Sequence, residues 1–336
     1  MTLDLSSLDA VAALGPTLPA FDIAAAEAAR ARQAHLTKPP GALGRLETLA
    51  EEFCGWRGDA RAEIVSAQAL VFAGNHGVCA QGVNPFPQEV TAQMVANFEH
   101  GGAAINQLCR VAGARLSVIP LDLDRPTADL SEGPAMTEAE TLAAMRAGAD
   151  AVDPAADILI LGEMGIGNST VAAALAHGLL GGEAGLWVGR GTGADEDGLA
   201  RKERVVARAA ERHGGLTPLE ALAALGGREQ AAICGAVLAA RAARIPVILD
   251  GYICTAAALP LHAADPALLA HCWVGHLSRE PGHRRLVEAL GKTPILDFDM
   301  ALGEGSGAAL ALSILRAALA CHNGMATFAE AGVSDG

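Results

Sequence analysis

Three glycine-rich turns carry the side chains of this sequence that are best suited to chemistry. The first follows an apolar run and reads Gly162-Glu163-Met164-Gly165-Ile166-Gly167-Asn168-Ser169-Thr170. Glycine lets the backbone approach a ligand closely, and the amides and hydroxyls at the start of the next helix can then bind a phosphate. An ordinary strand-to-helix turn would show the same glycines, and neither the P-loop nor the dinucleotide-fingerprint spacing is present. We predict phosphate contacts from Gly165, Ile166, Gly167, Asn168, Ser169 and Thr170.

The second turn reads Gly189-Arg190-Gly191-Thr192-Gly193 and precedes a helical pattern that contains Lys202. We expect it, too, to follow a strand. Two such turns at one sheet edge could hold a phosphate and a ribose, with Gly189 and Gly191 against the ligand. Lys202 would then pair with the phosphate, although an exposed helix lysine is the more ordinary interpretation.

The third turn, Leu302-Gly303-Glu304-Gly305-Ser306-Gly307, places a carboxylate between glycines. Such a glutamate gains no packing from its neighbours, which favours a functional role over a structural one. The alternative is a glutamate that merely stabilises the positive end of the following helix. We predict that Glu304 is functional and that Gly303 lies beside the substrate.

Isolated polar and apolar residues near strand ends give weaker signals. His76, in Gly74-Asn75-His76-Gly77-Val78, could orient a ligand or only satisfy backbone groups. Asp250 ends an apolar run and could bind a ribose hydroxyl or cap the next helix. Phe86 and Met94 could line an apolar pocket for a flat ring, although core packing is the default.

The composition excludes several classes of partner. The chain has 336 residues, a net charge of −14 and no run of Lys and Arg, which argues against nucleic acid and anionic membranes. Seven cysteines without a CxxC pair indicate reduced thiols. The histidines show no metal-ligand spacing and no apolar stretch is long enough to span a membrane. We expect a cytoplasmic protein with no metal and no cofactor.

Apolar runs that alternate with helical patterns predict an α/β fold with a parallel sheet covered on both faces by helices. The predicted strands are residues 67–73, 115–120, 157–161, 185–188, 246–249 and 271–274. Both ends of the chain read as helical instead, with two helices in 24–57 interrupted at 38–41. We predict a small helical domain from residues 1–60 plus 308–336 and a Rossmann-like catalytic domain over 61–307.

Six stretches in order together resemble the nicotinate-nucleotide:dimethylbenzimidazole phosphoribosyltransferase family over residues 30–331. These are 38–47, 74–78, 90–94, 162–170, 249–251 and 302–309. The resemblance implies a homodimer that acts on two small molecules, nicotinate mononucleotide and 5,6-dimethylbenzimidazole, giving α-ribazole 5′-phosphate and nicotinate in cobalamin nucleotide-loop assembly. It implies that Glu304 is the general base and Glu163 the second active-site carboxylate.

The same resemblance places Phe86, Gln88 and Met94 around the aromatic base, in a stretch that differs among members.

Two other functions are compatible with the same glycine-rich turns. A sugar-phosphate isomerase or lyase would require a Lys or His base near the sugar. A non-catalytic nucleotide- or base-binding sensor would not require Glu304 in an unpacked loop.

Overall fold

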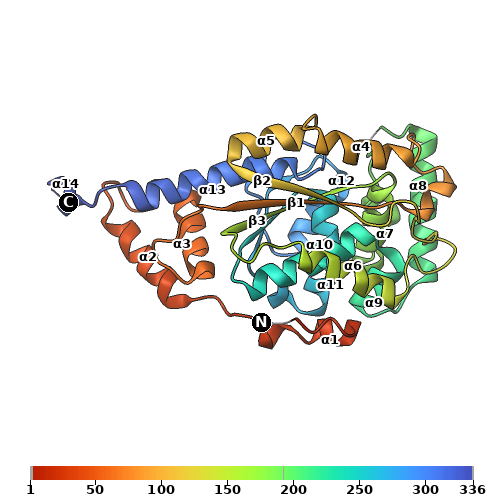
Figure 1. Cartoon of the computed structure of the whole chain (residues 1–336), viewed down its shortest axis with the longest axis horizontal. Helices are drawn as coiled ribbons and strands as arrows, with labels where there is room; N and C mark the ends of the chain where they lie inside the picture. The colour runs from red at the N-terminus through yellow and green to blue at the C-terminus, as the bar shows by residue number, and fades with distance from the viewer. Residues whose placement is uncertain (1–2, 192, 335–336) are drawn as a thin grey trace.

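The computed structural model, which describes residues 3–191 and 193–334, contains a five-stranded parallel sheet in the order β2-β1-β3-β4-β5 (Figure 1). The strands are β1 (Ala67–Ala73), β2 (Ala114–Pro120), β3 (Ile158–Met164), β4 (Val247–Leu249) and β5 (Cys272–Val274). A separate parallel pair consists of β6 (His276–Leu277) and β7 (Leu296–Asp297). The predicted α/β fold with a Rossmann-like parallel sheet is confirmed.

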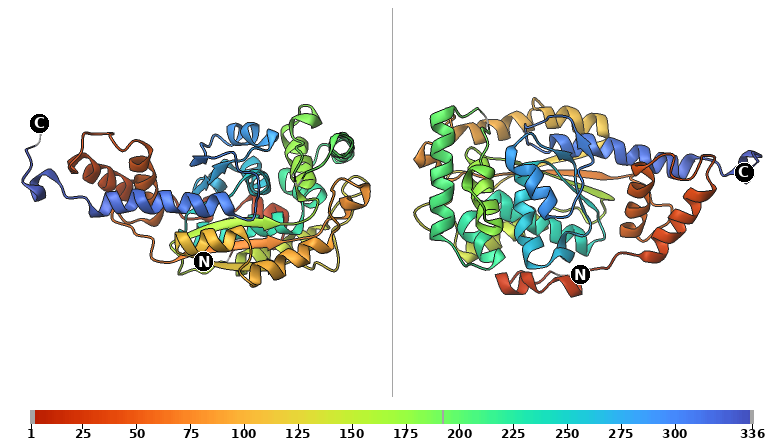
Figure 2. Two further views of the ribbon diagram at one scale, coloured as in Figure 1. Left: turned by 90° about the horizontal axis from the view of Figure 1, so that it is seen from above. Right: turned by 180° about the vertical axis from the view of Figure 1, so that it is seen from behind.

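Helices cover both faces of this sheet, and alternate residues of each strand face opposite layers. In β1, Ala69 and Val71 belong to one buried cluster, and Leu70 and Phe72 belong to the other. On the first face lie α4 (Glu89–Glu99), α5 (Ala104–Ala112) and α13 (Ser306–Gly324) (Figure 2). Residues of α3 (Arg45–Arg57) join the same buried cluster from beyond the end of the sheet. On the second face lie α6 (Glu138–Asp150), α7 (Asn168–Leu180), α9 (Pro218–Leu225), α10 (Arg228–Ala242) and α11 (Tyr252–Ala264). Burial on both faces explains why the strands read as continuous apolar runs.

The remaining elements are short or peripheral. The helices are α1 (Leu8–Ala12), α2 (Ile23–His35), α8 (Glu196–Arg212), α12 (Pro281–Ala289) and α14 (Phe328–Ala331). The 3-10 helices are η1 (Gly15–Thr17), η2 (Gly77–Gln81), η3 (Ala184–Leu186) and η4 (Pro266–Leu269).

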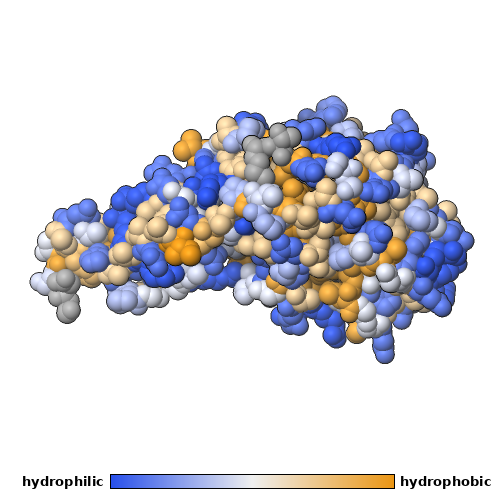
Figure 3. All heavy atoms as spheres, turned by 90° about the horizontal axis from the view of Figure 1, so that it is seen from below, coloured by the Kyte–Doolittle hydropathy of each residue, from blue (hydrophilic) through white to orange (hydrophobic). Residues whose placement is uncertain are grey.

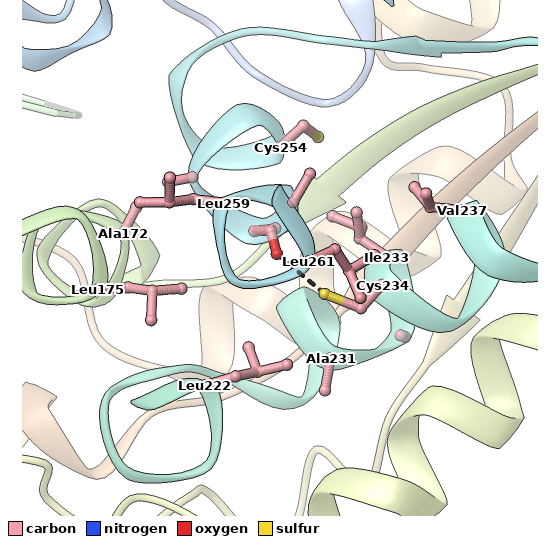
Figure 4. Close-up of a cluster of buried hydrophobic side chains, with 14 of the residues drawn as sticks. Ala172, Leu175, Leu222, Ala231, Ile233, Cys234, Val237, Cys254, Leu259 and Leu261 are labelled. Atoms are coloured by element: carbon pink, nitrogen blue, oxygen red, sulfur yellow. Dashed lines mark hydrogen bonds between the residues drawn. The ribbon is translucent and has the colours of Figure 1, made fainter. Parts of the chain in front are cut away.

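The core of the second face is built from small and aliphatic side chains (Figure 4). Leu175 of α7, Leu222 of α9 and Leu259 of α11 converge there with residues of α10. Helices α6 and α10 approach so closely that a Cβ atom on Gly235 would lie 1.8 Å from the Met145 carbonyl oxygen. At this contact the close packing of the two helices requires a glycine.

We expect Gly235→Ala to lower the free energy of unfolding by roughly 1–3 kcal/mol or more, because the added methyl group overpacks a backbone contact. Urea unfolding measures the change. Gly324→Ala is the matched control, since nothing lies within 4 Å of its added Cβ. Equal stability of the two variants would contradict this description of the α6–α10 contact.

Helices α2 and α3 and the end of α13 project from the sheet as a helical arm (Figure 1). Within the arm, the Arg32 guanidinium donates hydrogen bonds to the backbone carbonyls of His322 and Met325, both at 2.9 Å. The first residues of the chain lie elsewhere, because Leu8 and Val11 of α1 join the core of the second sheet face. The division into residues 1–60 plus 308–336 and 61–307 stays a prediction.

The surface shown in Figure 3 is uneven in hydropathy. Apolar residues gather at the middle of the part that contains the sheet, and the end of that part farthest from the helical arm is hydrophilic.

One predicted strand is wrong. Residues 185–188 fall at η3, where the amides of Leu186 and Trp187 bond to the nearby carbonyls of Glu183 and Ala184. Trp187 is buried, and its indole N–H donates to the Gly181 carbonyl. A short turn anchored by a buried tryptophan produces the same apolar signature as a buried strand, and the sequence pattern does not separate the two.

Candidate active site

A cavity of about 230 Å³ opens at the carboxyl ends of the strands. From β1 the chain continues to β2 on one side, and β3 then pairs with β1 on its other side. Ligands of parallel sheets bind at such a switch point between two strands, here β1 and β3. All three predicted turns reach the cavity. The predicted residues in its wall are Phe86, Met94, Glu163, Gly165, Ile166, Gly167, Asn168, Ser169, Gly191, Lys202, Asp250, Gly303 and Glu304.

The first turn joins β3 to α7 and presents the start of that helix to the cavity. Gly167 is the N-cap, with φ of +92°, and no side chain caps the helix at this position. A side chain there would also meet the sulfur of Cys79, 2.7 Å from an ideal Cβ. Thr170 is fully buried behind the wall, so Ser169 is the hydroxyl of this turn that faces the cavity.

Lys202 ties the second turn to the first. Its ammonium group donates to the Ser169 hydroxyl at 3.0 Å and to the Gly189 carbonyl at 3.2 Å. Only 3% of Lys202 is exposed, so the interpretation as an exposed helix lysine is wrong. Burial lowers its pKa, and the carboxylate of Glu280 opposes that shift. A buried cation beside an uncapped helix start is suited to a phosphate.

Gly191 lies between these groups, and Gly189 contributes its carbonyl behind the wall. An ideal Cβ on Gly191 would sit 2.8 Å from the Ser169 hydroxyl, so a side chain there would fill the site. The Gly191 amide donates to Glu280 at 3.2 Å. Thr192 of the predicted turn lies outside the described residues.

Glu163, near the end of β3, is 4% exposed and accepts a hydrogen bond from the Asn168 side chain. Burial raises its pKa well above the ordinary value of 4.5, and the nearby carboxylates of Asp250, Glu229 and Glu304 raise it further. Glu163 therefore retains a proton to a higher pH than a free glutamate does. A protonated Glu163 carboxyl is better suited to forming hydrogen bonds than to stabilising a positive charge.

Glu163→Gln should stabilise the protein increasingly as pH rises above 4.5, the ordinary pKa of the group. A carboxyl group with a raised folded-state pKa binds its proton more tightly when folded, so its ionisation lowers stability as pH rises through that range. Glutamine removes this cost. Melting temperatures of both proteins between pH 4 and 9 test it, and a difference that does not grow with pH would contradict the assignment.

Glu304 occupies a strained position at the cavity. Its φ is +64°, and Gly303 (+82°) and Gly305 (+87°) are also left-handed. Its side chain is almost buried, and its Oε2 atom has no hydrogen-bond partner among the described residues. Burial raises the pKa of Glu304, and Asp250 raises it further. A raised pKa brings a carboxylate closer to the range in which a general base works best.

Of the two roles predicted for Asp250, the structure contradicts one, the capping of the next helix. Asp250 lies in the cavity wall, but its carboxylate accepts hydrogen bonds from the amides of Gly305 at 3.1 Å and Ala308 at 2.9 Å. It therefore caps α13, and the following helix α11 has no side-chain cap. Whether it also contacts a sugar stays a prediction.

His76 and Gln88 lie behind the cavity wall. His76 is fully buried, with its Nε2 atom 3.2 Å from Glu229, and its carbonyl accepts a hydrogen bond from Gln88. Phe86, by contrast, is 46% exposed at the cavity and is free to contact a flat ring.

The polar residues of the wall that were not predicted include His276, Ser278 and Glu280. They directly follow the predicted strand at 271–274, and residues at the carboxyl end of a parallel strand are site candidates. That signal was present in the sequence. His276 is 1% exposed, and its Nε2 atom lies 3.6 Å from Asp250.

Neither a metal site nor a membrane-spanning helix is found in residues 3–191 and 193–334. Within these ranges, no group of three or more His, Cys, Asp or Glu side chains is arranged to hold a metal ion. No helix of the described chain has the length and apolar character needed to cross a membrane.

Comparison with known proteins identifies close relatives. A family model described as phosphoribosyltransferase matches residues 18–333. Nicotinate-nucleotide–dimethylbenzimidazole phosphoribosyltransferases from Rhodobacter capsulatus and Ruegeria pomeroyi are 63% and 62% identical to the chain, over 99% and 95% of both sequences. The crystal structure of CobT from Thermus thermophilus superposes with a TM-score of 0.88 at 46% identity, covering 93% of this chain and 100% of that one.

Proposed function

The chain belongs to the nicotinate-nucleotide–dimethylbenzimidazole phosphoribosyltransferase family, and we propose that it transfers the phosphoribosyl group of nicotinate mononucleotide to 5,6-dimethylbenzimidazole. The products are α-ribazole 5′-phosphate and nicotinate, in the assembly of the cobalamin nucleotide loop. One observation carries this proposal. A single cavity joins Glu304, whose Oε2 atom has no hydrogen-bond partner among the described residues, to the cradle formed by Ser169, Lys202 and the start of α7.

The two helix starts at the cavity support different roles. The amides at the start of α13 already bind the carboxylate of Asp250, whereas the start of α7 has no side-chain cap and lies beside the buried Lys202. A phosphate dianion is therefore stabilised at α7 and would meet like charge at α13. This orients the donor, with its phosphate at Ser169 and its C1′ atom toward Glu304.

In the proposed reaction, an unprotonated ring nitrogen of the acceptor attacks C1′ of the donor. The bond from C1′ to the pyridinium nitrogen breaks, and its electron pair neutralises the departing nicotinate ring. No general acid is required at the leaving group. Glu304 accepts the proton from the other acceptor nitrogen, which makes the attacking nitrogen more nucleophilic. Direct displacement inverts the β-linkage of the donor to the α-linkage of the product.

Glu163 has a secondary role in this proposal. Its raised pKa favours a protonated carboxyl that holds Asn168 and the acceptor by hydrogen bonds. Phe86 and Met94, which lie in the wall, provide apolar contacts for the acceptor ring. Alignment of the acceptor with C1′ then supplies much of the remaining acceleration.

The experiment is an incubation of the protein with nicotinate mononucleotide, with and without 5,6-dimethylbenzimidazole, followed by chromatography of the products. The proposal expects nicotinate and α-ribazole 5′-phosphate only when both substrates are present. Release of nicotinate without the acceptor would favour a lyase or hydrolase. Binding without any release would favour a sensor. A panel of benzimidazoles and purines then identifies the preferred acceptor.

We also propose that the enzyme is cytoplasmic, on the evidence of its unpaired cysteine spacing, and that it is a homodimer, as the family resemblance implies. Sedimentation velocity should give a particle of twice the chain mass of 34.1 kDa. A monomer at micromolar concentration would contradict the proposed assembly and would leave the proposed reaction intact.

A further inference from the structure

The turn that carries Glu304 is held in an unfavourable conformation. Three successive residues, Gly303, Glu304 and Gly305, have positive φ, and Glu304 is the one with a side chain. A left-handed residue with a side chain persists only where the surrounding structure fixes it. The proposed transfer requires its carboxylate at a defined distance from the acceptor. Some group must therefore hold this turn.

Asp250 binds the backbone that follows Glu304. Its two carboxylate oxygens accept from the amides of Gly305 and Ala308, which lie 55 and 58 residues further along the chain. These bonds fix the backbone immediately after Glu304 and the first turn of α13. Both carboxylate oxygens are used, and only 1% of Asp250 is exposed. We propose that Asp250 is a positioning residue that holds the 303–305 turn, and with it the Glu304 carboxylate, in the geometry that transfer requires.

His276 supports Asp250 from the other side. Its ring fits between two glycines, because a Cβ on Gly307 would lie 2.0 Å from the ring and a Cβ on Gly251 2.7 Å from its Nε2 atom. The imidazole thus packs against the start of α13 and against Asp250 at once. His276 lowers the pKa of Asp250, which opposes the effect of burial on that carboxyl group.

The charge of Asp250 gives this role a readout that a purely structural residue would lack. The groups that face Asp250 are Glu163 from β3, Cys254 from α11, His276 from β6 and Glu304 itself, with Glu229 of α10 behind Glu163. Asp250 raises the pKa of Glu304. Removal of its charge should therefore lower that pKa, and the base should remain ionised to a lower pH.

The inference rests on the proposed function, and Asp250→Asn tests it. An asparagine would turn its amide N–H toward one of the two backbone amides, so one hydrogen bond becomes a donor–donor contact. We expect kcat to fall roughly 10- to 100-fold, since a misplaced catalytic group costs about that much. The KM for nicotinate mononucleotide should stay near the wild-type value, and the acid limb of the kcat profile should move to lower pH.

Gly305→Ala is the matched comparison. It strains the same turn, because φ is +87° and the added Cβ would lie 3.3 Å from the Gly162 Cα, but it leaves the charge of Asp250 in place. It should lower kcat without moving the acid limb, and it carries the geometric part of the test if Asp250→Asn does not fold. Asp297→Asn, an exposed change outside the cavity wall, should alter neither quantity.

If the wild-type protein is active, three results would overturn the inference. The first is a wild-type kcat in Asp250→Asn or in Gly305→Ala. The second is an acid limb that does not move in Asp250→Asn, and the third is a raised donor KM with an unchanged kcat in Asp250→Asn. The last result would make Asp250 a contact of the sugar. An inactive wild-type protein would instead reject the proposed function, so the two failures are distinguishable.

Discussion

Glu304→Gln should lower kcat by about 10²- to 10⁴-fold, the usual contribution of a general base. Glutamine has the same shape as glutamate but cannot accept a proton. The acceptor nitrogen then keeps its proton as the new bond forms, and the opposite ring nitrogen is a weaker nucleophile. Initial rates of nicotinate release at saturating donor and acceptor give kcat directly.

The donor KM should change little in the same variant. The phosphate contacts come from Ser169 and Lys202, which the substitution leaves in place. Glu99→Gln, an exposed change on α4, is the matched control and should behave like wild type. A near-normal kcat in Glu304→Gln would remove Glu304 as the base and leave the family assignment standing.

Lys202→Met should raise the KM for nicotinate mononucleotide by about 10- to 100-fold. Hydrogen bonds to charged groups contribute about 1.5–3 kcal/mol, and each 1.4 kcal/mol corresponds to a tenfold change in affinity. Methionine retains the length of the side chain and loses the ammonium group that reaches Ser169. Steady-state kinetics with varied donor measure the change.

The phosphate-free donor, nicotinate riboside, separates charge recognition from folding. Lys202→Met should reduce its kcat/KM far less than it reduces that of the mononucleotide. Lys292→Met is the matched control, because that lysine also bonds to backbone carbonyls, those of Leu269 and Cys272, but lies outside the cavity wall. Equal losses with both donors would show that Lys202 only supports the fold.

Much of the sheet was predictable because its strands are parallel and buried on both faces. Residues 67–73 were predicted as a strand, and β1 has these bounds. The apolar segment at 185–188 failed because a buried Trp187 in a short 3-10 turn gives the same pattern. Local sequence thus identifies buried apolar segments, and tertiary pairing decides which of them are strands.

The candidate site was likewise predictable where its residues are close together in the sequence, and not where tertiary packing brings them together. Turns such as 165–169 and Glu304 are local in sequence, so their glycines reveal them. The burial of Lys202 depends on how α8 packs beside α7, and the true partner of Asp250 is the start of α13, 55 residues away. Neither pairing has a local signal. His276, Ser278 and Glu280 were predictable in principle, since they follow a strand that was itself predicted.

The central claim is that one cavity holds the acceptor base at Glu304 and the donor phosphate at Ser169 and Lys202. A crystal structure of the protein with α-ribazole 5′-phosphate and nicotinate tests it most directly. We predict a benzimidazole nitrogen within hydrogen-bonding distance, about 3 Å, of the Glu304 carboxylate, with the phosphate bound by Ser169 and Lys202. A phosphate bound at the start of α13, or a base out of reach of Glu304, would contradict the account.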